Sequence, residues 1–473
     1  MENKLESQRV LLDNLEQLVS YNFCVGCGLC TAICPTKSLR MIWNRFGTYE
    51  PVKTYETCSD CFICTQVCPF SDGLVKGISN PNEDQLGEVL FGSSDSSKDS
   101  KIGHFQECYA GYAKGFRQNS TSGGMTSWIL AFLLETGRVD KVICVQPDIS
   151  KNNLFEYRVC STIEEVCSGS KSRYYPVHQA DVLTEVMNEE ARYALVALPC
   201  FCKGIRFAQK QIDILNERII FCVGLFCGGM KSSHFTEYLA AQVGVNKDDI
   251  IKPQYRIKHE GPTSRSYSFG CANPSNKDEI LEFQVKHLGD LWGPGFFKPN
   301  ACDYCDDITS ELADISCGDA WIPPYSSDWR GNNIIITRSV AAQRLIDEGL
   351  NKNLLSLEKI TSKQVYKSLL PSFEHRRNGL AYRLYWALDQ PVPKKRIQPC
   401  RPSNPIKAKI YRQRMRVRQK SQETWLIHRD NTGIQHFNRE IRGDLNSLRR
   451  WQYVDRTLRK VIGGLRNIWA KSK

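Results

Sequence analysis

The N-terminal region contains the run Cys24-Val-Gly-Cys27-Gly-Leu-Cys30-Thr-Ala-Ile-Cys34-Pro35. Its spacing returns residue for residue at Cys58-Ser-Asp-Cys61-Phe-Ile-Cys64-Thr-Gln-Val-Cys68-Pro69. Two residues separate the first three cysteines of each run, so one short loop can present three thiolates to a single compact inorganic group. The fourth cysteine of each run lies further along, directly before a proline. The repeat therefore predicts a small domain built around two inorganic groups.

The spacing is that of bacterial two-cluster ferredoxins, in which the fourth cysteine of each run ligates the other cluster. We therefore expect two [4Fe–4S] clusters in this region. The expected ligands are, for the first cluster, Cys24, Cys27, Cys30 and Cys68, and, for the second, Cys58, Cys61, Cys64 and Cys34. The alternative is a pair of structural zinc sites. Zinc ligands usually come as two separated pairs, and this pattern has two runs of four.

The composition fits a globular protein: the 473 residues are 41% hydrophobic and 24% charged, with 21 cysteines. No stretch approaches 18 consecutive apolar residues, so we expect no membrane-spanning helix. The N-terminal MENKLESQRVLLDNLEQL is charged and helix-like, unlike a signal peptide. Together these features predict a cytoplasmic protein, whose many cysteines are metal ligands or redox groups more than disulfides.

The chain divides by composition into five segments. We expect an N-terminal helix at 1–20, a ferredoxin domain at 21–75, a solvated linker at 76–103, an α/β body at 104–390 and a basic helical tail at 391–473. The polar sequence SSDSSKDSK at the end of the linker segment suits solvent exposure. The predicted fold class is therefore α+β overall, with a mainly parallel α/β body.

The body alternates short apolar runs with helical patterns, which is typical of a parallel sheet covered by helices. A helix is expected over residues 123–137, because its apolar side chains share one face and Gly137 suits its end. The expected strands lie within VDKVICVQPD (139–148), ARYALVALPC (191–200), RIIFCVGLFC (218–227), LADISCGDAW (312–321) and NNIIITRS (332–339).

Six short blocks of the body, taken in order, resemble one known family, the beta subunits of coenzyme F420 hydrogenases and dehydrogenases. The blocks are STSGGMTSWIL (120–130), SGSKSRYYPV (168–177), ALPCFCKGIR (197–206), GLFCGG (224–229), CDYC (302–305) and ADISCGDAW (313–321). The resemblance covers residues 107–339, and the N-terminal ferredoxin domain is a common companion in this family. Chains of this length resemble its stand-alone bacterial type, which often accompanies polysaccharide synthesis.

The resemblance implies FAD, or FMN, bound beside a [4Fe–4S] cluster. The sequence offers two loops for the flavin phosphates. Ser122, Gly123 and Gly124 open the first expected helix, where free N–H groups suit a phosphate. Lys171, Ser172 and Arg173 lie on a second Gly/Ser-rich loop and can neutralise the same group. The plain alternative for the first loop is an ordinary helix N-cap.

A third [4Fe–4S] cluster is expected in the body. Cys200 and Cys227 each follow an expected strand, and ligands in α/β folds gather at the carboxyl ends of strands. Cys302 and Cys305 form a C-x2-C pair that completes the ligand set, although the same spacing also suits a redox-active dithiol. Three further cysteines keep the assignment open, Cys202, Cys222 and Cys317.

The other cysteines of the body and tail are isolated in the sequence, and we expect small apolar fillers or exposed thiols at Cys108, Cys144, Cys160, Cys167, Cys271 and Cys400. Asp319 and His287 are candidates for substrate contact, although each residue type is more often a satisfied structural group.

The tail is strongly basic. From residue 391 onward, 22 Lys and Arg stand against five Asp and Glu, a net charge of +17, whereas the whole chain carries +12. Leu458, Val461, Ile462, Leu465, Ile468 and Trp469 would share one face of a helix. Such a helix suits an anionic membrane surface at the inner membrane, or a protein partner. The plain alternative is a helix packed on the protein's own body, and nucleic acid is the least favoured partner.

These observations predict an iron–sulfur flavoprotein oxidoreductase that passes electrons between [4Fe–4S] clusters and a hydride-exchanging substrate. Its expected partners are a redox protein or a small-molecule hydride carrier. Two alternatives remain: an electron-transfer subunit that serves a separate catalytic protein, with a link to polysaccharide biosynthesis, and an interaction protein with a degenerate flavin site. A flavin with a pocket over its ring would favour the enzyme over both.

Overall fold

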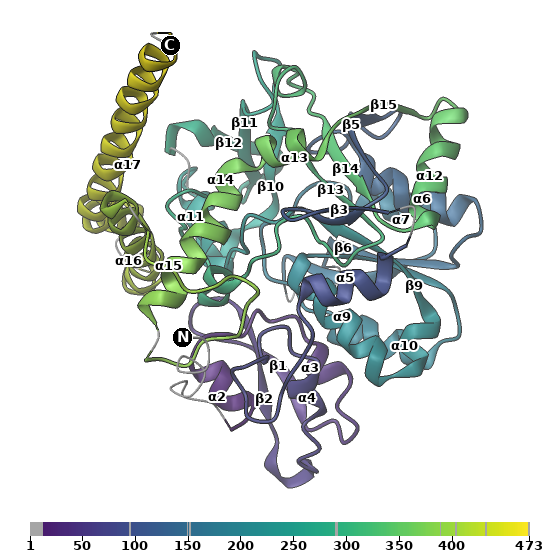
Figure 1. Cartoon of the computed structure of the whole chain (residues 1–473). Coiled ribbons are helices and arrows are strands. Elements are labelled where there is room, and N and C mark those ends of the chain that lie inside the picture. Colours follow the sequence, from purple (N-terminus) through teal and green to yellow (C-terminus); the bar gives the residue numbers. More distant parts are fainter. Residues whose placement is uncertain are drawn as a thin grey trace.

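The ferredoxin domain, the body and the helical tail follow one another along the chain and pack around a shared core (Figure 1). The computed structural model describes residues 13–93, 96–148, 150, 153–288, 292–387, 389–402, 404–430 and 433–471. Most of the expected N-terminal helix lies outside these residues, and its described part is helix α2 (Leu15–Ser20). Among the described residues, no helix is long and apolar enough to cross a membrane.

The ferredoxin domain is built from two short helices and a hairpin. Helix α3 (Leu29–Ala32) carries Cys30, and helix α4 (Ile63–Gln66) carries Cys64. Between them lie the antiparallel strands β1 (Leu39–Trp43) and β2 (Tyr49–Lys53), followed by the turn η1 (Tyr55–Thr57). The residue before each helix is left-handed, Gly28 with φ 81° and Phe62 with φ 58°. The two cysteine runs therefore fold alike, as their repeated spacing predicts.

The expectation of a solvated linker at 76–103 is wrong for most of that segment. Residues 83–91 form helix α5 (Glu83–Phe91), whose side chains Leu86 and Phe91 are buried. A small hairpin follows, with strands β3 (Ser97–Asp99) and β4 (Gly103–Phe105). The buried Glu83 pairs with the buried Lys203 of the body at 3.0 Å. The described residues of the polar stretch at 93–101 are largely exposed, as expected, but the prediction missed the buried side chains and the buried ion pair of α5.

The body is organised by an eight-stranded sheet in the order β15-β5-β14-β13-β9-β8-β6-β7. Its centre, from β13 to β6, is parallel, as predicted, whereas the strands at both edges run antiparallel. The strands are β5 (Glu107–Ala113), β6 (Lys141–Pro147), β7 (Phe155–Cys160), β8 (Tyr193–Ala197), β9 (Ile219–Leu225), β13 (Ile315–Asp319), β14 (Asn333–Thr337) and β15 (Leu355–Lys359).

Helices cover both faces of this sheet, because successive side chains of its buried strands point to opposite sides. In β8, Leu195 contributes to the core under helices α8 and α9, whereas Ala194 and Val196 contribute to the core under α6 and α12. The helices around the sheet are α6 (Met125–Glu135), α7 (Ile163–Ser168), α8 (Ala180–Asn188), α9 (Pro199–Gln211), α10 (Asp213–Arg218) and α12 (Val340–Asn351).

A second, smaller sheet was not predicted. Strands β10 (Ile251–Lys258), β11 (Tyr267–Asn273) and β12 (Asn276–Gln284) form an antiparallel unit beside helix α11 (Ser233–Ala241). The remaining short elements connect the sheets and lead to the tail. They are η2 (Lys247–Asp249), η3 (Val285–Leu288), η4 (Asn300–Tyr304), η5 (Tyr325–Ser327), α13 (Ser362–Ser368), α14 (Leu370–Phe373), the π-helical turn η6 (Glu374–Asn378) and α15 (Gly379–Trp386).

The tail is a pair of packed helices, α16 (Pro405–His428) and α17 (Gly433–Lys471). Helix α16 lies against the body, where Trp425 packs on Tyr238 and Phe297 and donates to Glu237 Oε2 at 2.9 Å. Helix α17 begins in the same core with Phe437 and extends outward from it (Figure 1). Self-packing, the plain alternative for this tail, therefore holds for α16 and the first half of α17.

The ferredoxin domain is seated directly on the body. Gln179 N donates to Cys27 O at 2.9 Å, and Ser233 N donates to Gly47 O at 2.8 Å. Leu29 packs so closely on α9 that a Cβ on Gly204 would approach its Cδ1 to 3.1 Å. These contacts place the cysteine runs against the carboxyl-end edge of the parallel strands, where Cys200 and Cys227 lie.

Replacing Trp425 by alanine should destabilise the protein by about 3–5 kcal/mol, because it empties a buried aromatic site between the tail and the body. Urea unfolding followed by circular dichroism measures the change. Ile427→Ala, on the same helix but 70% exposed, should leave the midpoint unchanged. Equal effects of the two substitutions would show that α16 is not docked as described.

Candidate functional site

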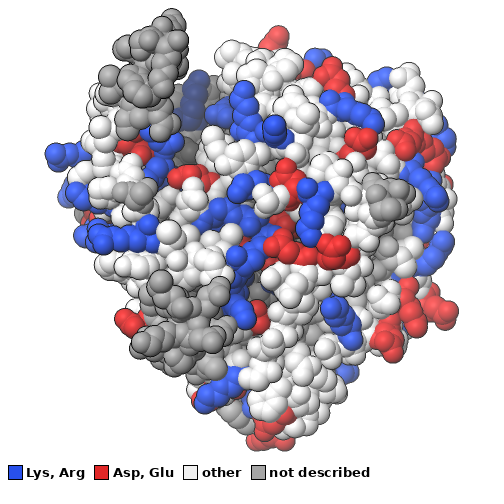
Figure 2. Space-filling model, viewed as in Figure 1, with Lys and Arg blue, Asp and Glu red and all other residues white. Residues whose placement is uncertain are grey.

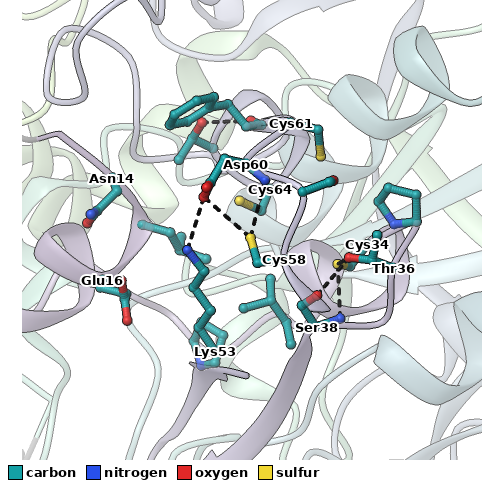
Figure 3. Close-up of a pocket in the computed structure, with 17 residues that line it drawn as sticks. Asn14, Glu16, Cys34, Thr36, Ser38, Lys53, Cys58, Asp60, Cys61 and Cys64 are labelled. Atoms are coloured by element: carbon teal, nitrogen blue, oxygen red, sulfur yellow. Dashed lines mark hydrogen bonds and ion pairs between the residues drawn. The ribbon is translucent and has the colours of Figure 1, made fainter. Parts of the chain in front are cut away.

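The four cysteines expected around the second cluster line one pocket near the surface of the ferredoxin domain. Cys34, Cys58, Cys61 and Cys64 all border it, and Figure 3 shows their sulfur atoms facing the same space. Cys34 comes from the first run, so the structure brings together the crossed set that the spacing predicts. Cys61 is exposed, which places this group at the molecular surface.

Hydrogen-bond donors already point at the sulfurs of this pocket. Ser38 N donates to Cys34 Sγ at 3.3 Å, and Asp60 N donates to Cys58 Sγ at 3.4 Å. Although burial raises the pKa of the Cys34 thiol, hydrogen bonds from Thr36 and Ser38 outweigh it and lower that pKa overall. Lys53 holds Asp60 in place at 3.1 Å. Donors of this kind stabilise thiolates, so the pocket fits a thiolate-ligated cluster.

The other crossed set, Cys24, Cys27, Cys30 and Cys68, lies deeper. Burial raises the pKa of the Cys27 thiol to about 11 and that of Cys68 to about 12. The thiols of Cys24 and Cys30 interact electrostatically with Cys27 and Cys68, so the set is close together. Gly26 N donates to Cys24 Sγ at 3.3 Å. Gly26 itself has φ 68°, and a Cβ there would approach Tyr49 O to 2.7 Å, which requires glycine.

The third expected set also comes together. Cys200 lies in the first turn of α9 just after β8, Cys227 follows β9, and Cys302 and Cys305 lie in and after η4. Burial and the neighbouring thiols of Cys305, Cys227 and Cys302 raise the pKa of Cys200 well above its ordinary value. Cys302 Sγ accepts a hydrogen bond from Met230 N at 3.4 Å. The residues present therefore fit a buried cluster.

The competing cysteines are engaged elsewhere. Cys202 and Cys222 lie close to each other, and Cys317 lies beside Thr126. Two of the expected fillers form a pair: the Cys144 and Cys160 sulfurs are 3.9 Å apart, and Gln146 Nε2 donates to both. Cys108 and Cys271 are buried, whereas Cys167 and Cys400 are exposed. Among the described residues, no three or more His, Cys, Asp or Glu side chains converge tightly enough to hold a single metal ion.

The two loops expected to hold flavin phosphates meet in the structure. Thr121 Oγ1 and Ser172 Oγ hydrogen-bond at 2.9 Å, and so do Ser127 Oγ and Ser170 Oγ. The residues of the first loop are also held by contacts within the fold. The Ser122 hydroxyl donates to Asn332 O at 2.9 Å, so it serves the fold. Gly123 and Gly124 are tightly packed, because a Cβ on either would approach backbone atoms to within 2.9 Å.

The second loop brings two cations to this place. Lys171 is exposed and donates to Gln254 Oε1 at 2.6 Å, whereas Arg173 stacks 4.7 Å over the ring of Phe155. Burial lowers the pKa of both, and the Arg173 charge lowers that of Lys171 further. Arg173 Nε is buried and has no hydrogen-bond partner within the described part of the chain. The two adjacent cations and the unpaired Arg173 Nε fit a binding site for an anion.

The sequence reasoning missed further charged residues at these loops, because they lie on the small sheet that it did not predict. Lys258 of β10 donates to Ser122 O at 3.0 Å and to Arg117 O at 2.7 Å. Burial, with the Arg117 and Arg256 charges, lowers the pKa of Lys258 to about 8. Arg256 binds Asp319 through two hydrogen bonds of 2.8 and 3.0 Å. Of the two candidates for substrate contact, Asp319 is therefore ion-paired with Arg256 at this site. The other, His287, is exposed in η3.

Aromatic side chains join the flavin loops to the third cysteine set. Tyr174, next to Arg173, packs edge-on against Trp292 with ring centroids 4.8 Å apart. Trp292 in turn lies over the backbone beside Cys227, since a Cβ on Gly228 would be 3.9 Å from its ring. The loops and the buried cysteines thus adjoin across one aromatic layer.

Comparisons with known proteins identify the family of this chain. The family profiles described as coenzyme F420 hydrogenase/dehydrogenase beta subunit match residues 108–184 with their N-terminal part and 190–363 with their C-terminal part, together more than half of the chain. Residues 23–71 match the 4Fe-4S dicluster domain, which confirms an iron–sulfur domain there.

Similar proteins come from methanogenic archaea. One subunit of the F(420)H(2) dehydrogenase of Methanosarcina mazei is 25% identical over 70% of this chain and 84% of its own. Coenzyme F420-dependent sulfite reductase of Methanocaldococcus jannaschii is 23% identical over 79% of this chain, which spans about half (54%) of that protein. Among solved structures, the F420-reducing [NiFe] hydrogenase complex of Methanosarcina barkeri has a chain that matches with 16% identity and a TM-score of 0.49, covering 63% of this chain and 98% of that one.

Full-length protein purified without oxygen should hold about twelve irons and twelve sulfides, four for each of three clusters. Cys305→Ala should lower the iron content to about eight, because it removes one ligand of the third cluster, whereas Cys400→Ala, at an exposed cysteine, should not change it. Iron and acid-labile sulfide analysis measures both. About eight irons in the unmodified protein would instead favour a dithiol at Cys302 and Cys305.

Proposed function

Because the chain belongs to the family of coenzyme F420 hydrogenase/dehydrogenase beta subunits, we propose that it is an iron–sulfur flavoprotein oxidoreductase that connects a redox partner with a hydride-exchanging substrate. Two [4Fe–4S] clusters are proposed in the ferredoxin domain, a third in the body, and FAD, or FMN, at the two loops. When bound, the clusters carry single electrons and the flavin exchanges hydride for single electrons.

One observation carries this proposal: the three cysteine sets form a series from the surface to the flavin loops. Cys64 of the surface set interacts electrostatically with Cys30 and Cys68 of the buried set. Cys27 of the buried set interacts in the same way with Cys200 of the third. Cys227 then adjoins Trp292 and the loops. Each set therefore has the next one as its neighbour, an order that electron transfer requires and that structural sites have no reason to adopt.

The protein's own residues would keep this series dry and fixed. Phe70 is buried beside Cys68, and Phe23 packs edge-on against Tyr304, next to Cys305, with ring centroids 5.1 Å apart. A low dielectric and the absence of water reduce the reorganisation that accompanies a change of charge. The body and the ferredoxin domain also share one core, so no hinge motion is needed to bring the sets together.

Lys171 and Arg173 are proposed to bind the flavin phosphates, and the paired Thr121 and Ser172 hydroxyls to fix the two loops to each other. Lys258 would orient the first loop through its contact with Ser122 O. The tight packing of Gly123 and Gly124 supports a backbone role for these glycines, since it leaves no room for a side chain at either position. Cation-bearing loops that meet at one place are well suited to a pyrophosphate.

The substrate is proposed to be a hydride carrier. The preferred candidate is the deazaflavin coenzyme F420, because the names of the similar archaeal proteins include F420. The dehydrogenase relative is named as one subunit of its enzyme, which supports a protein as the other redox partner. Its proposed docking place is the surface around Cys61, where the neighbouring Phe62 is 49% exposed.

The outer part of α17 is proposed to bind an anionic membrane surface. Basic residues are exposed there, and Lys and Arg side chains lie along the outer edge of the tail in Figure 2. The exposed basic and apolar side chains between residues 449 and 461 are Arg449, Arg450, Tyr453, Arg456, Leu458, Arg459, Lys460 and Val461. The acidic Asp455 among them is buried and paired with Lys407 and Arg459. The other positions of the expected apolar face, from residue 462 on, have no described side chains.

Full-length protein should release FAD or FMN on denaturation, and Lys171→Glu should lower the flavin content several-fold, because a carboxylate would repel the phosphates. Chromatography of the released cofactor measures this. Lys210→Glu reverses an exposed charge at the end of α9 and serves as the matched control. A protein that holds no flavin after anaerobic purification and incubation with FAD and FMN would contradict the proposal.

Reversing three charges on α17, with Arg449→Glu, Arg450→Glu and Arg456→Glu together, should abolish sedimentation with phosphatidylglycerol vesicles at low salt. Iron content should stay unchanged, since α17 lies outside the cysteine sets. A control with Lys114→Glu, Lys277→Glu and Lys286→Glu reverses as many exposed charges on the body and should still sediment. Failure of the unmodified protein to bind such vesicles would end the membrane proposal.

A further inference from the structure

Arg376 is a buried cation that faces the third cysteine set. It is 1% exposed and belongs to the π-helical turn η6. Its Nη2 lies 3.7 Å from Cys227 Sγ, and its Nη1 donates to Asp307 O at 3.1 Å. As thiolates, Cys305, Cys227, Cys302 and Cys200 all favour its charged form. The guanidinium therefore contacts Cys227 and lies within electrostatic reach of the other three cysteines of this set.

Four neighbouring cations have carboxylate partners, whereas Arg383 donates to backbone carbonyls. Lys298 and Arg418 bind Asp303, Arg396 binds Asp306 and Glu311, and Arg377 binds Glu311. Within the described part of the chain, Arg376 has no carboxylate in ion-pair distance, and its buried Nε, like that of Arg377, has no hydrogen-bond partner. A buried charge without a counter-charge costs several kcal/mol. Arg376 is therefore suited to an anion held by the cysteines that it faces.

A thiolate-ligated iron–sulfur cluster supplies that anion. Four thiolates outweigh the positive charge of the iron–sulfur core, so the whole group is negative, and one more electron makes it more negative. A nearby cation therefore stabilises the reduced state more than the oxidised state. The effect is strong where water cannot screen it, as at this fully buried side chain.

We propose that Arg376 is the counter-cation of the third cluster and raises its reduction potential, acting as a positioning and tuning residue through the cluster's charge. This inference rests on the proposed function, because it requires a cluster at Cys200, Cys227, Cys302 and Cys305. Its place in a π-helical turn is consistent with such a role, since turns of this kind are frequent at functional sites.

The π-helical turn η6 supplies a matched pair for the test. Arg376 and Arg377 are adjacent, but Arg377 turns away and binds Glu311 at 3.2 Å and Lys101 O at 3.3 Å. Arg376→Gln removes the charge and keeps a hydrogen-bond donor, Arg376→Lys keeps the charge on a shorter side chain, and Arg377→Gln removes a charge from the same turn away from the sulfurs.

The measurement is a redox titration of the anaerobically purified full-length proteins, followed by electron paramagnetic resonance, with iron content determined on each sample. We expect the third-cluster midpoint to move to more negative potential in Arg376→Gln, to move less in Arg376→Lys, and to stay in place in Arg377→Gln. Loss of the third cluster from Arg376→Gln alone, with retention in Arg376→Lys, also supports a counter-cation.

Two results overturn the inference: an unshifted midpoint in Arg376→Gln that holds the full iron content, or loss of the third cluster from Arg376→Gln and Arg376→Lys alike, which indicates a structural role. A shift of equal size in Arg377→Gln overturns it as well, because the effect would then be unspecific. Failure of the proposed function looks different: the unmodified protein would hold about eight irons, the content of two clusters.

Discussion

The close packing of Leu29 on Gly204 is the constraint on which the rest of the structure depends. Helix α9 passes directly under helix α3, and the missing side chain at residue 204 lets the two helices approach. At the same interface, Cys27, just before α3, lies near Cys200, at the start of α9. Since the helices belong to different parts of the chain, this single approach turns a separate iron–sulfur domain and a separate α/β body into one continuous interior.

The charged residues follow from that arrangement. An interior that holds anionic groups must hold cations, and the chain supplies them from far away in sequence, through Arg376, Arg383 and Arg396 in the segment before α16. Each side chain is buried among groups of the body: Arg383 donates to Asp303 O at 2.7 Å, and Arg396 binds Asp306 at 3.0 Å. This segment therefore completes the electrostatics of the body before the two tail helices begin.

The sequence predicted those features that depend on local spacing. The crossed ligand sets of the ferredoxin domain follow from the cysteine runs, and the parallel strands of the sheet centre follow from buried apolar runs. The prediction failed where polar side chains have partners that are distant in the sequence. Helix α5 was predicted to be part of a linker, because the sequence does not show that Glu83 pairs with Lys203, 120 residues away. The small sheet with Lys258 and the inward orientation of Arg376 were not predicted. No sequence periodicity indicates the role of either residue, because that role depends on which groups fold against it.

Three cysteine sets that form one series should hold three clusters in contact distance of one another. Electron paramagnetic resonance of the fully reduced full-length protein detects this, because neighbouring clusters broaden and split one another's signals. We expect three spins per protein, all of them magnetically coupled. Two coupled spins without a third, or three signals that show no mutual interaction, would contradict it.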